Sequence, residues 1–439
     1  MRERVDCGLG KHWKALVVAL ALVAGGRAAL GQDLGALRRT GVLRVGTAGD
    51  YAPFSLAKGD TITGFDAEVA TRIARDLGVR VQWVRFRWPD LADDLSAGKF
   101  DLVASGVTVR PERALLGRYT RPYAVAGAVA LVRREDSERL ADRAALNRPG
   151  VHIAVNRGGH LERLAHRLFP NATIEPVTDN SELPDRVLGA RVHAALTDTI
   201  EARGWLRPEL SLIGPFSRDR KALLVRRAAP ELAHWLDTWL RERERDGWLG
   251  QLRRQWLGDS MFFAAGADRE AVLQDIDLRC RLMPLVAATK IAQGLPIEDR
   301  GQEARVLERA KATARQVGIE PEQVVRLFAS LVRAAKIIQA TSGTDPRALA
   351  PPLEQLRDAI AGIDEHLVHQ LRAAARTVKP MEWHAGVREG VEADGLTAAL
   401  KADIADALAK SRTLAGSPKP AKKQAPPAVD APGPEPQLR

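Results

Sequence analysis

The segment LTDTIEAR, residues 196–203, combines residue types that could perform acid–base chemistry. Asp198 and Glu201 follow the apolar run HAALT, which is typical of a buried strand. Because the carboxyl ends of parallel strands open on a cleft, Glu201 could act there as a proton donor or acceptor. The alternative is an ordinary strand end, followed by a helix whose first turn carries both carboxylates to complement its dipole.

A second group of polar residues, in the C-terminal half, has helical spacing. Arg279 and Lys290 are eleven positions apart, close to three helical turns, so we expect both on one face of a long helix. Asp299 and Glu303 are four apart and share a face of the next helix, and Gln339 lies on a third. Three helices that converge on one pocket would surround a dianion. The alternative is a set of exposed helix charges with partners four residues away.

The elements that must position the first group alternate along residues 40–258. GVLRVGTA, VRVQWVRF and DLVASGVT have strand patterns, while ITGFDAEVATRIARDLG and DLADDLSAGKF have helical ones. The order restarts near YAVAGAVALVRRED, with strands GVHIAVN, NATIEPV and HAALTDT; KALLVRR then returns the chain to two closing helices. Two parallel α/β units joined by extended crossings predict two lobes with a cleft between them.

The rest of the folded chain, residues 269–412, has helical periodicity with breaks at GLPIED, GIEPE, SGTDPRALAPP and VKPMEW. It predicts four or five helices and no strands. The expected fold is thus a two-lobed α/β domain followed by an all-α domain. The predicted divisions are 1–31 for a signal peptide, 32–260 for the α/β domain, 266–412 for the helical domain and 413–439 for a disordered tail rich in Pro, Ala and Lys.

The first 31 residues have the pattern of a secretory signal. A basic start precedes the apolar run ALVVALALVAGG and the small-x-small sequence Ala29-Leu30-Gly31, which predicts a mature start near Gln32. This apolar run is too short to span a bilayer, and no later segment is long and apolar enough. We expect an exported protein, periplasmic if the host is Gram-negative.

Composition narrows the classes of partner. The 439 residues carry a net charge of +11, but the arginines alternate with Asp and Glu, and no basic run is interleaved with aromatic residues. We therefore expect small anionic substrates and no nucleic acid. Only Cys280 remains after the signal segment, which contains Cys7, and its apolar neighbours favour helix packing over a nucleophilic role. No His or Cys cluster has metal-ligand spacing, so we expect no metal.

Several long runs resemble a known family over residues 34–258. VLRVGTAGDYAPFS, GFDAEVATRIARDLG, SGVTVRPERALLGRYTRPY and DGWLGQLRRQWLG are similar to the periplasmic amino-acid-type solute-binding proteins. RWPDL, PGVHIAVNRGGH and TDTIEAR further resemble the periplasmic cyclohexadienyl dehydratases, enzymes built on that binding-protein fold. The resemblance implies conversion of prephenate or arogenate to an aromatic product by loss of the C4 hydroxyl and the ring carboxylate.

This resemblance implies roles for five residues. Glu201 would protonate the leaving hydroxyl, which requires a raised pKa such as a closed, partly apolar cleft provides. Asn156 would hold polar groups of the substrate, and Thr108 with Arg113 would bind a carboxylate. Asp198 corresponds to the residue that holds an amino group in amino-acid binders. Structural alternatives are that Asn156 only caps a turn and that Arg113 is a solvated helix residue.

The glycine pair Gly158-Gly159 offers backbone N–H groups at a helix start, a further place for an anion. His160 follows this pair, where the family would have a small hydroxyl residue. Because the residue at this position would contact the substrate carboxylates, we expect these contacts to differ from those of the family.

The C-terminal half carries a second resemblance. IDLRCRLMPLVAATKIAQGLPIEDRGQEARVLERA and GIEPEQVVRLFASLVRAAKIIQ are similar to the all-helical chorismate mutases, over about residues 269–340. PPLEQLRDAIAGIDEHLVHQLRAAA resembles the extra helices of the secreted subclass, in which an arginine of the same chain completes the site; Arg357 matches that position. The implied reaction is the pericyclic rearrangement of chorismate to prephenate.

For this rearrangement the protein must hold the compact conformer of chorismate and stabilise negative charge on the ether oxygen. The resemblance assigns Lys290 and Gln339 to that oxygen, and Glu303 to the ring hydroxyl with help from Asp299. Arg279 and Arg357 would bind the carboxylates. Gln302 and Ala335 depart from the family, which usually has an arginine and a Ser or Thr there, and the loss of a cation and a hydroxyl would weaken binding.

The two halves form consecutive steps, because the mutase makes the substrate of the dehydratase. The sequence therefore predicts an exported bifunctional enzyme of phenylalanine biosynthesis that acts on chorismate and on prephenate or arogenate, without a cofactor. One alternative is a solute-binding module for an amino or aromatic acid fused to a mutase. Another is a degenerate mutase domain that only stabilises or dimerises the chain, and the oligomeric state is left open.

Overall fold

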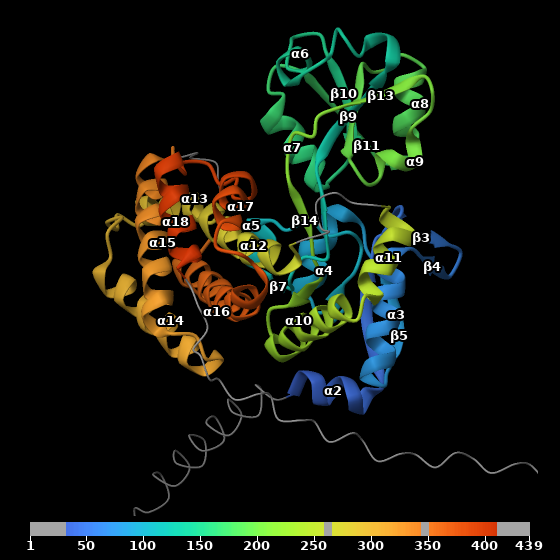
Figure 1. The fold of residues 1–439 in the computed structure, drawn as a ribbon. Coiled ribbons are helices and arrows are strands. Elements are labelled where there is room, and N and C mark those ends of the chain that lie inside the picture. Colours follow the sequence, from blue (N-terminus) through green and yellow to red (C-terminus); the bar gives the residue numbers. More distant parts are fainter. Residues whose placement is uncertain (1–31, 259–265, 344–350, 411–439) are drawn as a thin grey trace, which may run out of the picture.

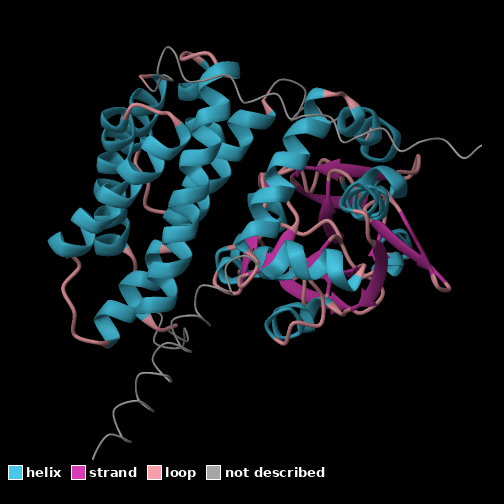
Figure 2. Ribbon diagram, turned by 90° about the horizontal axis from the view of Figure 1, so that it is seen from below, coloured by secondary structure: helices cyan, strands magenta, loops and turns pink. Residues whose placement is uncertain are grey.

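The computed structural model describes residues 32–258, 266–343 and 351–410. Figure 1 shows a two-lobed α/β part followed by a helical part, and Figure 2 shows that the strands are confined to the first of these. The predicted signal peptide, the tail from residue 413 and most of the joint between the parts lie outside the described residues.

Lobe one is built on a five-stranded sheet in the order β5-β1-β6-β15-β7. β1 pairs in parallel with β5 and β6, as expected, whereas β15 runs antiparallel to both β6 and β7. The helix α3 packs its apolar face inward and ends at Gly78, whose left-handed conformation (φ 74°) suits glycine.

The strands are β1 (Val42–Thr47), β5 (Arg80–Arg85), β6 (Leu102–Val103), β7 (Gly117–Tyr119) and β15 (Leu224–Arg226), with the small sheet β2 (Asp50–Tyr51), β3 (Ser55–Lys58) and β4 (Thr61–Thr63) beside them. The helices are α2 (Gln32–Thr40), α3 (Phe65–Leu77), α4 (Leu91–Ser96), α5 (Pro111–Ala114), α10 (Pro230–Arg245) and α11 (Trp248–Leu257).

Lobe two repeats this plan with the sheet order β11-β10-β12-β9-β13. β10 is parallel to β11 and β12, and the antiparallel β9 and β13 complete the sheet. Two apolar clusters cover its two faces. The strands are β9 (Ala128–Arg133), β10 (His152–Asn156), β11 (Thr173–Val177), β12 (Ala194–Asp198) and β13 (Leu210–Ile213), and the helices are α6 (Arg143–Leu146), α7 (His160–Leu168), α8 (Leu183–Leu188) and α9 (Ala202–Trp205).

Two antiparallel strands cross between the lobes. β8 (Ala124–Ala126) pairs with β14 (Asp219–Lys221), so the chain leaves and re-enters lobe one side by side. This double crossing is the extended connection that the sequence predicts between two α/β units.

The described residues of the helical part form seven helices and no strand, rather than four or five helices. One reason is that the expected long helix with Arg279 and Lys290 is divided: α12 ends at Arg281 and α13 begins at Met283, immediately before Pro284. Proline lacks the N–H of a continuous helix and clashes with the preceding turn. The helices are α12 (Ala267–Arg281), α13 (Met283–Ala292), α14 (Arg300–Val317), α15 (Pro321–Thr341), α16 (Leu353–Thr377), α17 (Glu382–Gly390) and α18 (Ala398–Ala409).

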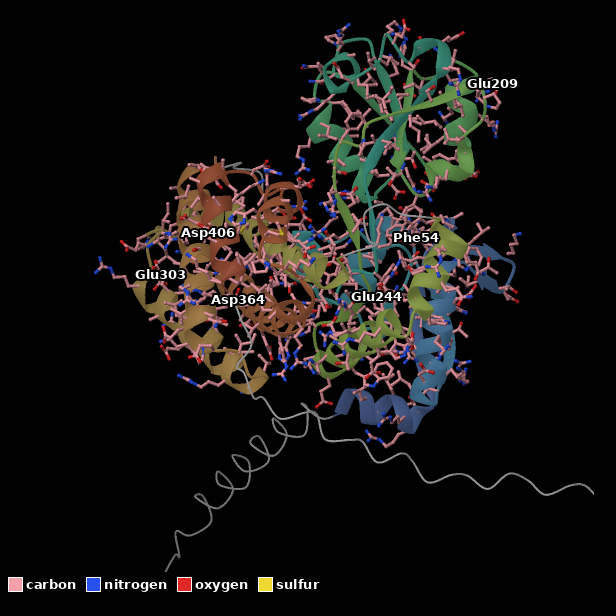
Figure 3. All side chains as sticks on the ribbon, in the orientation of Figure 1. Phe54, Glu209, Glu244, Glu303, Asp364 and Asp406 are labelled. Atoms are coloured by element: carbon pink, nitrogen blue, oxygen red, sulfur yellow. The ribbon has the colours of Figure 1, made fainter. Side chains whose placement is uncertain are left out.

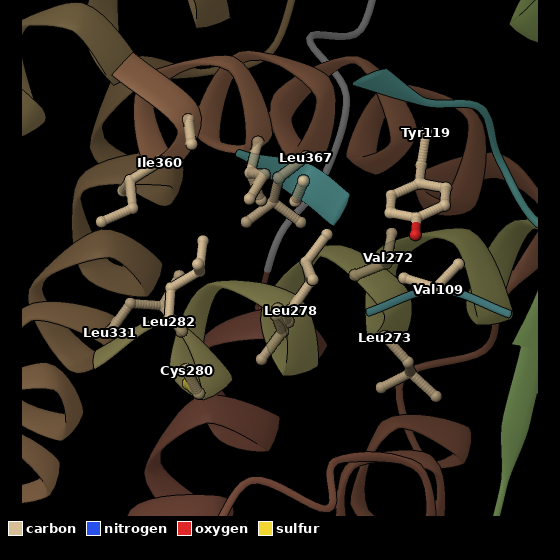
Figure 4. Close-up of a cluster of buried hydrophobic side chains, with 14 of the residues drawn as sticks. Val109, Tyr119, Val272, Leu273, Leu278, Cys280, Leu282, Leu331, Ile360 and Leu367 are labelled. Atoms are coloured by element: carbon tan, nitrogen blue, oxygen red, sulfur yellow. The ribbon is translucent and has the colours of Figure 1, made fainter. Parts of the chain in front are cut away.

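Lobe one and the helical part share one hydrophobic core. A single cluster of buried side chains joins Val109 and Tyr119 of lobe one to Val272, Leu273 and Leu278 of α12, as Figure 4 shows. Every residue from 270 to 280 of α12 is buried, because this helix is covered both by lobe one and by its own helical neighbours. Cys280 lies in this core, which bears out packing rather than exposure of its thiol.

Buried ion pairs reinforce this contact. Glu270, 1% exposed, accepts from Arg220 at 3.0 Å and from Arg218 at 2.6 Å, while Arg121 pairs with Asp268 at 2.7 Å. Charges removed from water are tolerated only with such partners. The helical part is thus docked on lobe one through a specific interface.

Candidate active sites

The first candidate site is a pocket between the two lobes. Lobe one contributes Tyr51, Trp88 and Thr108, lobe two contributes Leu161 and Asn180, and the remaining walls come from the predicted residues and the crossing strand. The lobes touch at its edge, where a Cβ on Gly158 would lie 2.5 Å from Cγ of Pro89. The cleft is therefore closed in this structure.

Glu201 lies in this pocket, on the turn between β12 and α9. Its carboxyl group accepts from Asn180 Nδ2 and, at 2.7 Å, from Thr197 Oγ1. Burial and the nearby Asp198 carboxylate raise the pKa of Glu201 well above its usual range. These surroundings favour the protonated carboxyl group, which is the form that can donate a proton.

Asp198, three residues earlier, is fully engaged by the protein. One oxygen accepts from two backbone N–H groups of the following turn, those of Ile200 and Glu201, each at 2.9 Å. The other oxygen accepts from the Tyr51 hydroxyl and lies 3.2 Å from Lys221 Nζ. Lys221 also donates to Tyr51 Oη and Thr108 Oγ1, each at 2.9 Å.

Arg113 and Asn156 face the same pocket from opposite lobes. Arg113 is buried, donates to the Thr108 carbonyl at 3.3 Å and lies 5.6 Å over the ring of Trp88, so it is not a solvated helix residue. Burial lowers the pKa of Arg113 to about 10, which leaves it cationic at neutral pH. Asn156 ends β10, as the sequence predicts.

The glycine pair is used differently from expectation. The N–H of Gly158 donates to the Glu162 carboxylate of the following helix, so the chain itself occupies this anion position. His160 instead lies in the cleft, with Nε2 2.9 Å from Asp219 Oδ1. Burial opposes ionisation of Asp219, yet the neighbouring His160 and Lys221 outweigh it and lower the pKa of Asp219 to about 2.

Sequence reasoning missed Lys221, Tyr51 and the His160–Asp219 contact as parts of the cleft. The motif runs contain Tyr51 and His160 without assigning them a role, and Lys221 stands in a segment that only predicts a strand. Its position in the cleft depends on β14 crossing between the lobes, which no local pattern indicates.

The second candidate site is a pocket within the helical part. Arg279 (α12), Lys290 (α13), Glu303 (α14), Gln339 (α15) and Arg357 (α16) all line it, together with Asp299 at the start of α14. The structure thus brings together all six residues that the sequence singles out, although α12 and α13 are separate helices. Figure 3 shows two of the acidic side chains of this part, Glu303 and Asp364.

The cations of this pocket are held in place by carboxylates. Arg279 pairs with Asp364 at 2.8 Å, and Arg357 pairs with Asp299 at 2.8 Å. Asp299 also accepts from the Gln302 N–H at 2.9 Å and so caps α14. Desolvation lowers the pKa of Lys290, whose Nζ donates to the Ile297 carbonyl at 2.5 Å.

Two departures from the family pattern, Gln302 and Ala335, line the pocket as well. A cation that the sequence did not single out, Lys336, also lines it and donates to Glu303 Oε2 at 3.2 Å. Gln339 is buried, and among the described residues its Oε1 has no hydrogen-bond partner and its Nε2 donates only to the sulfur of Met283, at 3.6 Å. Because a thioether is a weak acceptor, this amide remains able to bind a ligand oxygen.

Among the described residues, no group of three or more His, Cys, Asp or Glu side chains is arranged to hold a metal ion. No helix within the described ranges has the length and apolar character that a membrane crossing requires.

Comparison with known families divides the chain in the same way. Residues 43–259 match the bacterial extracellular solute-binding proteins, family 3, and residues 268–340 match chorismate mutase type II.

Individual relatives match the first part. The chain is 32% identical to cyclohexadienyl dehydratase of Pseudomonas aeruginosa over 257 residues, which are 56% of this chain and 96% of that protein. It is 28% identical to the L-cystine-binding protein TcyJ of Escherichia coli over 260 residues, 57% of this chain and 96% of that one. A solved structure of an ancestral amino acid-binding protein, a precursor of cyclohexadienyl dehydratase, is 33% identical and covers 51% of this chain and 99% of that one, with a TM-score of 0.49.

Proposed function

Because the chain belongs to the bacterial extracellular solute-binding proteins of family 3 and carries a type II chorismate mutase domain behind that module, we propose that it is a bifunctional enzyme of phenylalanine biosynthesis. The helical part converts chorismate to prephenate. The two-lobed part then converts prephenate to phenylpyruvate, and arogenate would give phenylalanine in the same way.

In the mutase pocket, Arg279 and Arg357 bind the two carboxylates of chorismate, and Glu303 takes the ring hydroxyl. Asp299 holds Arg357 at 2.8 Å in this arrangement. Lys290 and Gln339 donate to the ether oxygen as its C–O bond breaks, which stabilises the charge that develops there. No nucleophile takes part, because the rearrangement is pericyclic.

In the cleft, Glu201 protonates the C4 hydroxyl of prephenate, which leaves as water. The ring carboxylate leaves as carbon dioxide, and the electron pair of its broken C–C bond completes the aromatic ring. Arg113 and Thr108 hold the side-chain carboxylate, and Asn156 binds polar groups without adding charge. The buried Glu201 with its raised pKa is the observation that carries this proposal, since a protonated carboxyl has no use in simple retention of an amino acid.

The occupied state of Asp198 favours a keto acid over an amino acid. In a binder this carboxylate would receive the ammonium group of the ligand, but here Lys221 and Tyr51 already supply its cation and its hydroxyl donor. Prephenate, which has a ketone in place of the amine, needs no such acceptor. We therefore propose that the cleft prefers prephenate to arogenate as its substrate.

The same family supports a place of action outside the cytoplasm. Family 3 comprises extracellular proteins. We propose residues 1–31 as the signal peptide, 32–260 and 266–412 as the two enzymatic domains, and the periplasm as their location.

The decisive experiment incubates the protein without residues 1–31 with chorismate and follows chorismate, prephenate and phenylpyruvate together. Phenylpyruvate is the expected end product, and Glu201→Gln should halt the sequence at prephenate. Accumulation of prephenate alone in the parent protein would make the first part a solute-binding module. If chorismate is not consumed, the helical part has no mutase activity and is a structural domain. Prephenate is then supplied directly to test the first part.

A further inference from the structure

A third pocket lies where the helical part packs on lobe one. Its walls come from β7 and α10 on one side and from α12 and α16 on the other. Arg118, Arg227, His234, His366 and His369 are among its lining residues, and none of them belongs to either site described above. Because His234 is exposed, the pocket opens to solvent.

One end of this pocket is cationic. Arg118 Nε donates to the Arg227 carbonyl at 3.3 Å, and Arg227 Nη1 donates to the Ala114 carbonyl at 3.3 Å. Within the described part of the chain, neither guanidinium has a carboxylate within the 4.0 Å of an ion pair. Burial and the proximity of Arg118 lower the pKa of Arg227. Two neighbouring cations that share a partly desolvated place are stabilised by an anion between them.

Apart from the carboxylates Asp237, Asp275 and Glu365, the first two of which contact His366, the remaining walls are mainly apolar. They include Ala114, Tyr119, Ala233, Leu278 and Ile363, and the cavity measures about 100 Å³. A dry cavity of about 150 Å³ accommodates benzene, so this smaller one takes the acid group and part of a ring, and the rest of the ligand extends toward the open side. The combination of an apolar chamber and a cationic end fits a small carboxylic acid with a compact apolar body.

We propose that this interdomain pocket binds an apolar monocarboxylate, of the class to which an aryl keto acid belongs, and that its occupant lowers the affinity of the mutase pocket for its substrate. The identity of the acid rests on the proposed function, because the cleft would release an aryl keto acid. The existence of the site does not.

The pocket is connected to the mutase site through two helices. On α12, Leu278 lines the interdomain pocket and the adjacent Arg279 lines the mutase pocket. On α16, Ile363 faces the interdomain pocket, and the adjacent Asp364 fixes Arg279 at 2.8 Å. A ligand that separates α12 from α16 therefore displaces a carboxylate-binding arginine, which raises the KM for chorismate.

The test uses the mature chain with Glu201→Gln, so that no keto acid forms during the assay, and phenylpyruvate as the probe. We expect saturating phenylpyruvate to raise the KM for chorismate about fivefold or more, with kcat nearly unchanged. The double variant Arg118→Gln/Arg227→Gln should keep its basal mutase activity and lose the response. The control variant Arg315→Gln/Arg326→Gln removes two exposed arginines of α14 and α15 and should keep the response.

Gly362→Ala provides a second variant that retains all charges. A Cβ on this residue of α16 would lie 2.9 Å from Arg118 Nη1 and displace that guanidinium, while alanine favours the helix. It should weaken the response without loss of folding.

Equilibrium dialysis with phenylpyruvate tests whether the interdomain pocket binds this acid, even for a chain that does not turn over chorismate. The Arg118→Gln/Arg227→Gln variant should bind one molecule fewer per chain than the parent. Equal binding by both, or a kinetic response that persists in the double variant, would overturn the proposal, because the acid would then act at the mutase pocket itself. Failure of the proposed function appears separately, as the absence of prephenate or phenylpyruvate from the substrate assay.

Discussion

At the scale of single residues, Glu201 and Asp198 have opposite surroundings although they share one turn. Asp198 contacts the cation Lys221, whereas the oxygens of Glu201 receive only neutral donors, Thr197 and Asn180. The surroundings of Asp198 therefore stabilise a carboxylate, whereas those of Glu201 favour the protonated form that the proposed dehydratase step requires.

The raised pKa of Glu201 determines the pH dependence of the dehydratase step. Burial, then Asp198, favours the protonated form, and that form is the one that donates to the hydroxyl. The kcat for prephenate should therefore be highest at low and neutral pH and fall as pH rises through the raised pKa. Steady-state rates between pH 5 and 10, at saturating prephenate, test this; a rate that increases with pH would contradict the acid role.

Lys221→Met should change the choice between the two cyclohexadienyl substrates. Without the ammonium of Lys221, Asp198 loses its cation and can accept the ammonium of arogenate. A charged hydrogen bond contributes about 1.5–3 kcal/mol, so the ratio of kcat/KM for arogenate over prephenate should rise about tenfold. Parallel assays with both substrates measure this ratio, and an unchanged ratio would show that Lys221 does not replace a substrate ammonium.

Gln302→Arg should strengthen the mutase. Gln302 lines the pocket where the resemblance to the chorismate mutases led us to expect an arginine, and its Oε1 accepts from Arg305, which lies outside the pocket. A third guanidinium near the dianion should lower the KM for chorismate about tenfold. Ala335→Ser, which restores a hydroxyl at the other departure, provides a smaller companion change. A KM that stays constant in both variants would mean that Lys336 already supplies the missing charge.

The sequence located the residues that line the two pockets better than it located their partners. Glu201, Arg113 and the mutase cations stand in motifs whose local spacing is preserved in the fold. Lys221 could not be found in this way, because its contacts with Tyr51 and Asp198 join segments 170 and 23 positions away in the chain. Such pairs depend on tertiary structure alone.

At the scale of elements, the three-residue strand β14 links the cleft to the helical part. Side chains alternate along a strand, so Asp219 and Lys221 point into the cleft while Arg220 points toward the helical part. There Arg220 meets Glu270 at 3.0 Å and the Gly390 carbonyl at 2.8 Å. The helical part therefore helps to fix the backbone from which two cleft residues project.

Glu270→Gln should consequently impair the dehydratase from within the mutase domain. It removes the counter-charge of the buried Arg220, and coupled residues of this kind typically interact by about 0.5–3 kcal/mol, so kcat/KM for prephenate should fall about tenfold. Mutase kinetics should change little. Glu308→Gln, in an exposed pair with Lys311 on α14, is the matched control. Equal losses in both activities would indicate general destabilisation.

Element patterns predicted the alternation of strands and helices in the lobes and the absence of strands from the described helical part. They did not predict that β9 and β15 run antiparallel to the strands on either side of them, since an apolar run such as KALLVRR fits either direction. The break between α12 and α13 was also missed, although Pro284 was visible, because the apolar periodicity continues through it.

At the scale of the whole molecule, His366 connects the two parts. Its ring contacts Asp237 of lobe one and lies 2.7 Å from Asp275 of α12. Burial alone would lower the pKa of His366, but the two carboxylates outweigh it and raise the pKa well above 6.5. The charged ring therefore holds the interface.

The sign of this effect predicts how stability depends on pH. A histidine whose folded-state pKa is raised contributes stability that is complete below about pH 6.5 and is lost as pH rises through the folded value. The thermal midpoint of the parent should thus decline between pH 7 and 10, and the decline should be smaller in His366→Gln. Calorimetry over this range measures both, and identical slopes would exclude a charged interface histidine.

The sequence predicts two folded parts in the observed order, but it gives no sign that they share a core. Val272 and Leu273 have the spacing of ordinary helix positions, and only the structure shows that Val109 and Tyr119 cover them. The sequence of a helix that is buried on every side differs little from that of a helix with one buried face and some apolar residues on its exposed face. The pattern of α12 therefore did not reveal its second buried face.

Because of this shared core, the covalent connection between residues 258 and 266 is not what holds the two parts together. A protease that cut there would not release a free mutase, because α12 would lose lobe one from its apolar surface and Glu270 would lose Arg220. The two fragments would stay together as an obligate heterodimer, and neither gene segment could be moved to another protein without a new surface for α12.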